Sequence, residues 1–152
     1  KLKREDKISM SKNKNRFLRA DKDFVPCRID DGDEMFRNGI FEFNITKMIE
    51  FIHANPSEFV SEEVSVDDFP REFSSINEEH INIVQISELV ILAEIAPGRY
   101  NLIDGNHRME KARRLGVESL GAYKLNVKQH IKFLVSKTAY IAHVNYWNSK
   151  LE

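Results

Sequence analysis

The sequence contains few of the residues that mark several common classes of protein. Its 152 residues include one cysteine, Cys27, which excludes an intrachain disulfide and is typical of a reducing compartment. No apolar run approaches the roughly 18 residues that a transmembrane helix needs, so we expect no membrane partner. The N-terminus is charged and lacks the apolar core of a secretory signal. These absences together predict a cytoplasmic protein.

Acidic and basic residues nearly balance, with a formal net charge of −1, but they are unevenly distributed. Residues 1–24 contain nine Lys and Arg against four Asp and Glu, whereas residues 30–79 contain three against fourteen. We interpret residues 1–22 as a basic, disordered tail before one domain over residues 23–152, and such a tail can attract nucleic acid. The acidic middle would repel a duplex lying across it, which disfavours broad non-specific DNA binding.

Apolar periodicity predicts helices in three places. Asn44 is expected to cap a helix that ends near Ala54, because apolar residues recur between them at helical spacing. A second helix pattern starts directly after Gly105 and stops at Gly116. A third, amphipathic helix is expected over residues 128–148.

Strand patterns alternate with these helices. Asn38-Gly39 suggests a hairpin or a loop, and Pro97-Gly98 suggests a hairpin turn. The acidic segment 57–80 has no pattern that decides its structure. Strands are expected over residues 24–29, 81–86, 89–95, 100–103 and 120–127. The order of elements predicts an α+β domain in which a small mixed sheet is packed by helices.

The most informative stretch is residues 100–116, YNLIDGNHRMEKARRLG. A strand-like apolar run ends just before Gly105, and the helix pattern then places His107 and Arg108 in its first turn. Two potentially cationic side chains at the positive end of a helix dipole are locally unfavourable unless an anion binds there. Helix amide groups, a glycine that allows close approach and a bidentate arginine together predict a phosphate site.

This stretch resembles the ParB/sulfiredoxin superfamily, whose members carry a Gly-x-x-Arg motif between a strand and a helix. Forms of the motif include GERR, GCHR and DGHHR, and here it reads Asp104-Gly105-Asn106-His107-Arg108. The run ARRLG that follows is also common in that superfamily. The resemblance implies a ParB/sulfiredoxin-like domain that binds the phosphates of a nucleotide, ATP or CTP, with Mg²⁺.

The resemblance extends over residues 81–127 and does not fix one activity. Its members include a sulfinic-acid reductase, CTP-binding DNA-partition proteins, free-serine kinases and proteins described as nucleases. Asn106 stands where sulfiredoxins place their reactive cysteine, and Cys27 is remote in sequence, so reductase chemistry is not expected. His107 stands where the GERR form has a second arginine. The DGHHR of free-serine kinases is the most similar form, but five residues do not identify a substrate.

Each motif residue has a functional and a structural interpretation. Arg108 either clamps a phosphate or pairs with Asp104, and we favour the clamp. His107 either donates to a phosphate or transfers a proton, or it supports the fold through a hydrogen bond. Asp104 could hold Mg²⁺ through water, act as a base, or cap the helix, which is the favoured single role. His107 and Asp104 are therefore the candidate catalytic residues, and Gly105, Asn106, His107 and Arg108 the candidate nucleotide contacts. No residue is assigned as a direct metal ligand.

Other polar residues have less specific interpretations. Glu110, Arg113 and Arg114 are expected on the surface of the motif helix. Glu94 could point toward the site from the preceding strand. His53 is expected to pack against the domain or to cap its helix.

Three functional hypotheses follow. The first is a nucleotide-handling enzyme that hydrolyses or transfers a phosphoryl group. The second is a DNA-associated ParB-like module, with or without nuclease activity, that uses the basic N-terminus or the C-terminal helix. The third is an inactive domain that serves protein contacts. We favour the first.

Overall fold

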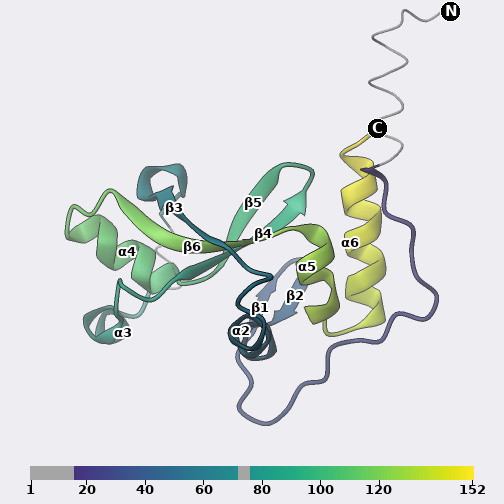
Figure 1. Cartoon of the computed structure of the whole chain (residues 1–152), viewed down its shortest axis with the longest axis horizontal. Helices are drawn as coiled ribbons and strands as arrows, with labels where there is room; N and C mark the ends of the chain where they lie inside the picture. Colours follow the sequence, from purple (N-terminus) through teal and green to yellow (C-terminus); the bar gives the residue numbers. More distant parts are fainter. Residues whose placement is uncertain (1–15, 72–75) are drawn as a thin grey trace, which may run out of the picture.

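The fold is built on a four-stranded mixed sheet with helices on both faces (Figure 1). The computed structural model describes residues 16–71 and 76–152. The strand order is β3-β6-β4-β5, in which β4 and β6 are parallel and the other neighbours are antiparallel. The strands are β3 (Ser61–Ser65), β4 (Val90–Ala96), β5 (Arg99–Asp104) and β6 (Ser119–Leu125). This arrangement confirms the expected α+β class.

The segment that carries the motif folds as predicted. β4 turns at Pro97-Gly98 into antiparallel β5, and Gly98 adopts a φ of 74° that glycine reaches without strain. Helix α4 (Asn106–Arg114) follows β5 and leads the chain into β6. The strands expected over 89–95, 100–103 and 120–127 are confirmed, with small differences at their ends.

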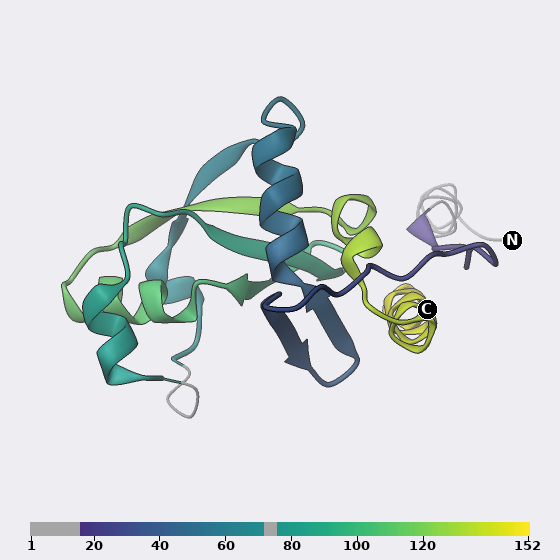
Figure 2. The same cartoon turned by 90° about the horizontal axis from the view of Figure 1, so that it is seen from below.

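A separate hairpin precedes the first long helix. Strands β1 (Met35–Asn38) and β2 (Phe41–Asn44) pair antiparallel, so of the two possibilities, hairpin or loop, the hairpin forms. Its turn residues are Gly39 and Ile40, because Asn38 still pairs with Phe41. Helix α2 (Ile45–Ala54) follows directly, and the Asn44 side chain accepts a hydrogen bond from the Lys47 amide. The predicted cap of this helix is therefore confirmed. Figure 2 shows α2 lying across one face of the sheet.

The strand predicted over residues 81–86 is wrong. Helix α3 (Glu78–Ile83) occupies this region, because the Asn77 side chain caps the Glu79 and His80 amides. Acidic residues in the first turn add a favourable interaction with the helix dipole, and these local terms outweigh a short alternating pattern. The segment that gave no pattern also contains β3 and a short 3₁₀ helix (Val66–Asp68).

The single C-terminal helix predicted over residues 128–148 is also wrong. The chain forms α5 (Val127–His130), a 3₁₀ turn (Ile131–Phe133) and α6 (Lys137–Ser149). The break occurs where Leu134 forms a bridge with Phe43, and where the Val135 amide donates to Glu42 O at 3.2 Å. Pairing with β2 thus replaces helical hydrogen bonds, and Ser136 caps the new helix.

The strand predicted over residues 24–29 does not form. Cys27 N donates to Leu134 O at 2.8 Å, but these residues are not part of a strand. Pro26 lacks an amide hydrogen, which limits its pairing. The segment is held instead by side-chain contacts, including the stacked rings of Phe24 and Tyr140.

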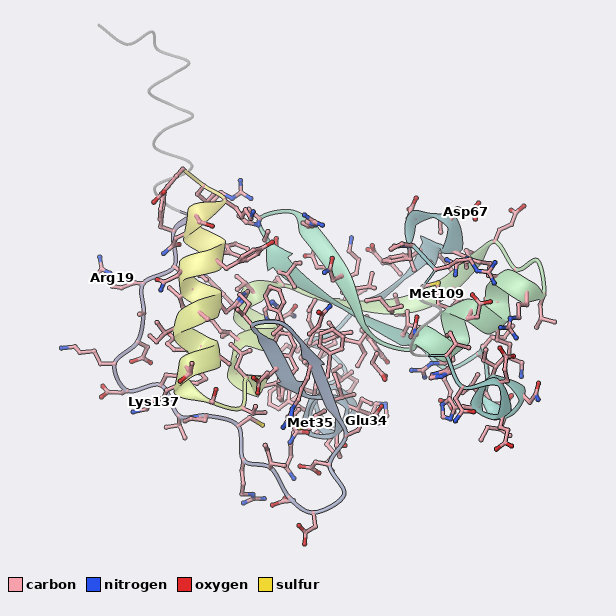
Figure 3. All side chains as sticks on the ribbon, turned by 180° about the vertical axis from the view of Figure 1, so that it is seen from behind. Arg19, Glu34, Met35, Asp67, Met109 and Lys137 are labelled. Atoms are coloured by element: carbon pink, nitrogen blue, oxygen red, sulfur yellow. The ribbon has the colours of Figure 1, made fainter. Side chains whose placement is uncertain are left out.

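The core lies on both faces of the sheet. One face packs against α2 and α6, and the other packs against α4, through the buried Met109 and Ala112. Figure 1 shows α3 and α4 at one end of the sheet and α6 at the other. Figure 3 shows Met109 and Asp67 at the α4 end, whereas Lys137 marks the start of α6 toward the opposite end.

The part of the basic N-terminal segment that the structure describes is attached to α6. Trp147 Nε1 donates to Arg16 O at 2.9 Å, and Leu18 exchanges two hydrogen bonds with the Asn148 side chain. The remainder of the tail expected over residues 1–22, residues 1–15, lies outside the described residues. No helix in residues 16–71 or 76–152 is long and apolar enough to cross a membrane.

Candidate functional site

The motif places a glycine at the junction between β5 and α4. Gly105 is the N-cap of the nine-residue helix α4 and adopts a φ of 107°. A Cβ atom at this position would lie 2.4 Å from Val90 Cγ1, so both the backbone angle and the close approach require glycine. Because glycine has no side chain, it offers no cap to the first-turn amides of α4. The helix therefore presents the end that favours an anion.

Arg108 lies in the first turn of α4 and is held by two carboxylates. Its Nη2 donates to Asp104 Oδ2 at 2.9 Å, and its Nη1 donates to Glu88 Oε2 at 3.2 Å. The Arg108 and Asp104 side chains are each 13% exposed, whereas that of Glu88 is 66% exposed. Asp104 is therefore an ion-pair partner of Arg108, and Gly105 takes the capping position that sequence reasoning assigned to Asp104.

A pocket of about 380 Å³ opens beside this ion pair. Its apolar walls come from α2, from β4 and the residue before it, and from β6, as follows: Ile49, Ile52, Leu89, Ile91 and Tyr123. The sheet register explains how they meet the motif, because Ile91 pairs with Asp104 on one side and with Tyr123 on the other. Directly paired residues place their side chains on the same face of a sheet. Asp104 thus faces the side of the sheet that α2 covers.

The polar residues of the pocket are Asp104, Arg108, Glu88 and His53. Two of them, Asp104 and Arg108, were predicted from the motif. Glu88 and His53 were not, since neither stands in a recognisable pattern. His53 was expected to pack or to cap, but its side chain is exposed and lines the pocket from the last turn of α2.

His107 lies beside Arg108 in sequence but binds a different part of the molecule. Its Nε2 accepts a hydrogen bond from the Asn77 amide at 3.0 Å, and its ring lies against that of His80, with centroids 4.5 Å apart. Burial and the neighbouring His80 lower the pKa of His107. The neutral ring therefore supports the start of α3, and His107 is not among the residues that line the pocket. Asn106 begins α4 and is half-buried.

Glu94 does not reach the site. Its two carboxylate oxygens accept from the amides of Gly98 at 3.0 Å and Val127 at 3.2 Å. The side chain therefore closes the β4-β5 turn against the start of α5, and the suggestion that it points toward the motif is wrong.

Glu110 is buried, although it was expected on the helix surface. Its carboxylate accepts hydrogen bonds from Arg71, Arg113 and Arg114, and these partners lower its pKa to about 2. Arg114 also donates to both carboxylate oxygens of Glu78, at 2.6 and 2.9 Å. This cluster fastens α3 and the segment before it to α4. It therefore stabilises the helix that positions Arg108.

The described residues contain no cluster of side chains that could bind a metal ion by itself. In residues 16–71 and 76–152, no three His, Cys, Asp or Glu side chains come together in a way that could hold a metal ion. Cys27 is not a lining residue of the pocket, and burial raises the pKa of its thiol, which disfavours the reactive thiolate. Comparisons of the chain with protein-family models, curated proteins and solved structures found no match.

Proposed function

We propose that the pocket beside Arg108 binds ATP or CTP through the phosphates, as the Mg²⁺ complex. One observation supports this most strongly: Arg108, in the first turn of the glycine-capped helix α4, lines a pocket with apolar walls together with Asp104. Gly105 and Asn106 are not among the lining residues of that pocket. Helix N-termini and arginines both bind phosphate oxygens well. The volume of about 380 Å³ lies at the lower end of the roughly 300–1,000 Å³ that is usual for small-molecule sites.

Gly105 also leaves room for the Arg108 side chain, since the space that a Cβ would occupy is already filled by Val90 and bordered by the guanidinium. A Cβ atom at Gly105 would lie 3.1 Å from Arg108 Nη2, so a larger residue there would crowd the arginine. The apolar walls suit a base and a ribose, and Tyr123 offers an aromatic surface.

The charges of the pocket favour a metal-complexed nucleotide over a free one. Glu88 and Asp104 contribute two negative charges, and Arg108 contributes one positive charge. A free triphosphate would be repelled by the carboxylates, whereas Mg²⁺ neutralises part of its charge before it arrives. Binding should therefore depend on Mg²⁺.

The proposed reaction is hydrolysis or transfer of a phosphoryl group. Arg108 would exchange its carboxylate partners for phosphate oxygens and stabilise the charge that develops on them. Asp104, released from that pair, would accept a proton from the attacking water or hydroxyl group. His107 would take no direct part in the transfer, because its Nε2 already accepts the Asn77 amide and its side chain does not line the pocket.

The alternatives have less support on the described residues. A DNA-associated module depends on the basic residues 1–22, of which residues 1–15 are not described and residues 16–22 lie beside α6. An inactive interaction domain does not account for the Asp104–Arg108 ion pair on the wall of a pocket. We also propose a cytoplasmic location, where nucleotides are abundant and Cys27 remains reduced.

A thermal-shift panel tests the proposal. The full chain is melted with ATP, ADP, CTP and GTP, each with and without Mg²⁺. Ligand at about 100 times its Kd stabilises a protein by about 2.7 kcal/mol, so a shift of several degrees is expected for ATP or CTP with Mg²⁺. Arg108→Ala should abolish the shift, measured against the melting temperature of the same variant without ligand.

Arg99→Ala provides the matched control. Arg99 is an exposed arginine at the opposite end of β5 and does not line the pocket. It should leave the nucleotide-dependent shift unchanged. A wild-type melting temperature that no nucleotide moves would refute the proposed function.

A further inference from the structure

We infer that His53, in its protonated form, is a second cationic contact for the phosphates bound beside Arg108, and that it makes nucleotide affinity rise as the pH falls. This inference rests on the proposed nucleotide site and adds a specificity-determining residue to it. Neither the motif nor its spacing pointed to this histidine, which lies about fifty residues before Arg108 in the chain.

The position of His53 on α2 directs it to the pocket. Ile49, Ile52 and His53 are spaced three and four residues apart, so they share one face of the helix. All three line the pocket, and the two isoleucines form the apolar wall next to the imidazole. The helix brings the imidazole to the same cavity that Arg108 reaches from α4.

His53 is available for a ligand in a way that the other polar residues are not. Arg108 is bound to Asp104 and Glu88, and His107 is bound to Asn77. His53 is exposed and makes no hydrogen bond or ion pair with the described residues. No described residue therefore competes with a ligand for the imidazole nitrogens through such a contact.

The charges around His53 bear on how the pocket receives an anion. His53 lies in the last turn of α2, where the negative end of the helix dipole stabilises a cation. The ionisable groups that face the pocket from the other elements are Glu88, Asp104, Arg108 and Tyr123. With His53 neutral, the carboxylates outnumber the guanidinium, whereas a protonated His53 brings the formal charge of the lining to zero. The pocket then receives an anion more readily.

Histidine is also the residue type whose charge changes between about pH 5 and pH 8. Carboxylic acids, guanidinium groups and phenols in model peptides titrate outside that range. The imidazole is thus the one lining side chain type that can give a pH dependence near neutrality. A phosphate group itself titrates near pH 6, so a variant of the protein must separate the two effects.

The test measures the Kd of Mg²⁺-ATP, Mg²⁺-CTP and Mg²⁺-tripolyphosphate by calorimetry at about pH 6 and about pH 8, the range in which imidazole titrates. The wild-type chain, His53→Gln, His53→Lys and the control His80→Gln are compared. His80 is an exposed histidine on α3 that does not line the pocket. Unliganded melting temperatures establish that each variant is folded.

We expect His53→Gln to weaken binding about tenfold near pH 6 and little near pH 8, because a charge-assisted hydrogen bond is lost only where the ring is protonated. His53→Lys should bind tightly at both pH values, and His80→Gln should resemble wild type. Tripolyphosphate, which has no base, should show the same differences, since the contact is with phosphate.

Two results would overturn the inference while leaving the nucleotide site intact. One is wild-type affinity in His53→Gln at both pH values, and the other is an equal loss at both, which would mean that the neutral ring makes the contact. Failure of the proposed function is a different result. In that case Arg108→Ala, measured in the same titrations, would bind all three ligands as the wild type does, or none of the chains would bind them.

Discussion

His107 and Arg108 are adjacent in α4, yet their side chains bind two different segments. His107 Nε2 accepts the amide hydrogen of Asn77 at 3.0 Å, whereas Arg108 donates to Glu88 at 3.2 Å and to Asp104 at 2.9 Å. The first turn of α4 therefore holds the start of α3 with one residue and the mouth of the pocket with the next. The two roles are separable by mutation.

His107→Ala should loosen α3 while nucleotide binding changes little. The variant leaves the Asn77 amide without its acceptor, at a cost of about 1 kcal/mol. Hydrogen exchange at the α3 amides should accelerate, and the thermal shift with Mg²⁺-nucleotide should persist. Arg108→Ala should show the reverse pattern. A complete loss of binding in His107→Ala would mean that this ring also contacts the ligand.

Gly105→Ala should disrupt the motif, and Gly116→Ala serves as its control. Both glycines have positive φ, at 107° and 72°, but only a Cβ at Gly105 would collide with Val90. Gly116→Ala should lower the free energy of unfolding only through backbone strain, by about 1–2 kcal/mol. Gly105→Ala should lower it by roughly a further 1 kcal/mol or more, because of the collision with Val90. Chemical denaturation compares the two. Equal destabilisation would show that the close approach to Val90 is unimportant.

Glu88→Gln should tighten nucleotide binding. Glu88 competes for Arg108 from an exposed position, so removal of its charge frees the guanidinium and reduces repulsion of phosphate. A two- to fivefold lower Kd is the order of magnitude expected from an exposed ion pair. Glu62→Gln, which breaks the exposed pair with Lys124 away from the pocket, should have no effect. Weaker binding in Glu88→Gln would indicate a direct role for this carboxylate.

Two buried histidines should make the fold sensitive to acid. His130 and His143 are fully buried, and burial lowers their pKa values to about 3 and about 4. The unfolded chain takes up protons below about pH 6.5 and the folded chain does not, so stability is complete above that pH and falls toward pH 4. The slope should approach about 1.4 kcal/mol per pH unit for each histidine. Urea denaturation between those pH values measures it.

Replacement of one of these histidines provides the control for that slope. Neither ring nitrogen of His143 has a hydrogen-bond partner among the described residues. His143→Leu should therefore raise the free energy of unfolding near pH 7 by about 1 kcal/mol and reduce the acid slope. An unchanged slope would assign the acid sensitivity to other groups.

Glu110→Gln should destabilise the α3-α4 end of the molecule. The carboxylate is buried and accepts from three arginines, so the neutral amide loses charge-assisted bonds worth about 1–3 kcal/mol, part of which the exposed guanidinium groups recover in water. Its lowered pKa means that this stabilisation is present above about pH 4.5 and is lost as the pH falls toward 2. Denaturation of the variant and the wild type at neutral pH measures the difference.

Local signals in the sequence were sufficient for the elements around the motif. The hairpin near Gly39, the Asn44 cap and the Gly105 junction each depend on a few neighbouring residues, and the structure has all of them. The C-terminal helix was different, because its break at Leu134 depends on pairing with Phe43, about ninety residues earlier in the chain. The hydrophobic pattern within a short stretch of sequence carries no information about a contact between residues so far apart in the chain.

The sequence was sufficient to predict the motif residues of the candidate site, but not the other residues that line its pocket. Arg108 and Asp104 follow from the strand-glycine-helix pattern, whereas His53 reaches the pocket only because α2 packs across the sheet. The burial of Glu110 likewise depends on Arg71, which is distant in sequence. Tertiary packing decides both, and neither residue stands in a pattern of its own.

The most direct test of the central claim is a titration of the ¹⁵N-labelled chain with Mg²⁺-ATP and Mg²⁺-CTP, followed through its backbone amide resonances. The account predicts that the largest saturable shifts occur at Gly105, Asn106, His107 and Arg108, and that Arg108→Ala abolishes them. Saturable shifts confined to other segments, or no shifts at millimolar nucleotide, would contradict a phosphate site at the start of α4.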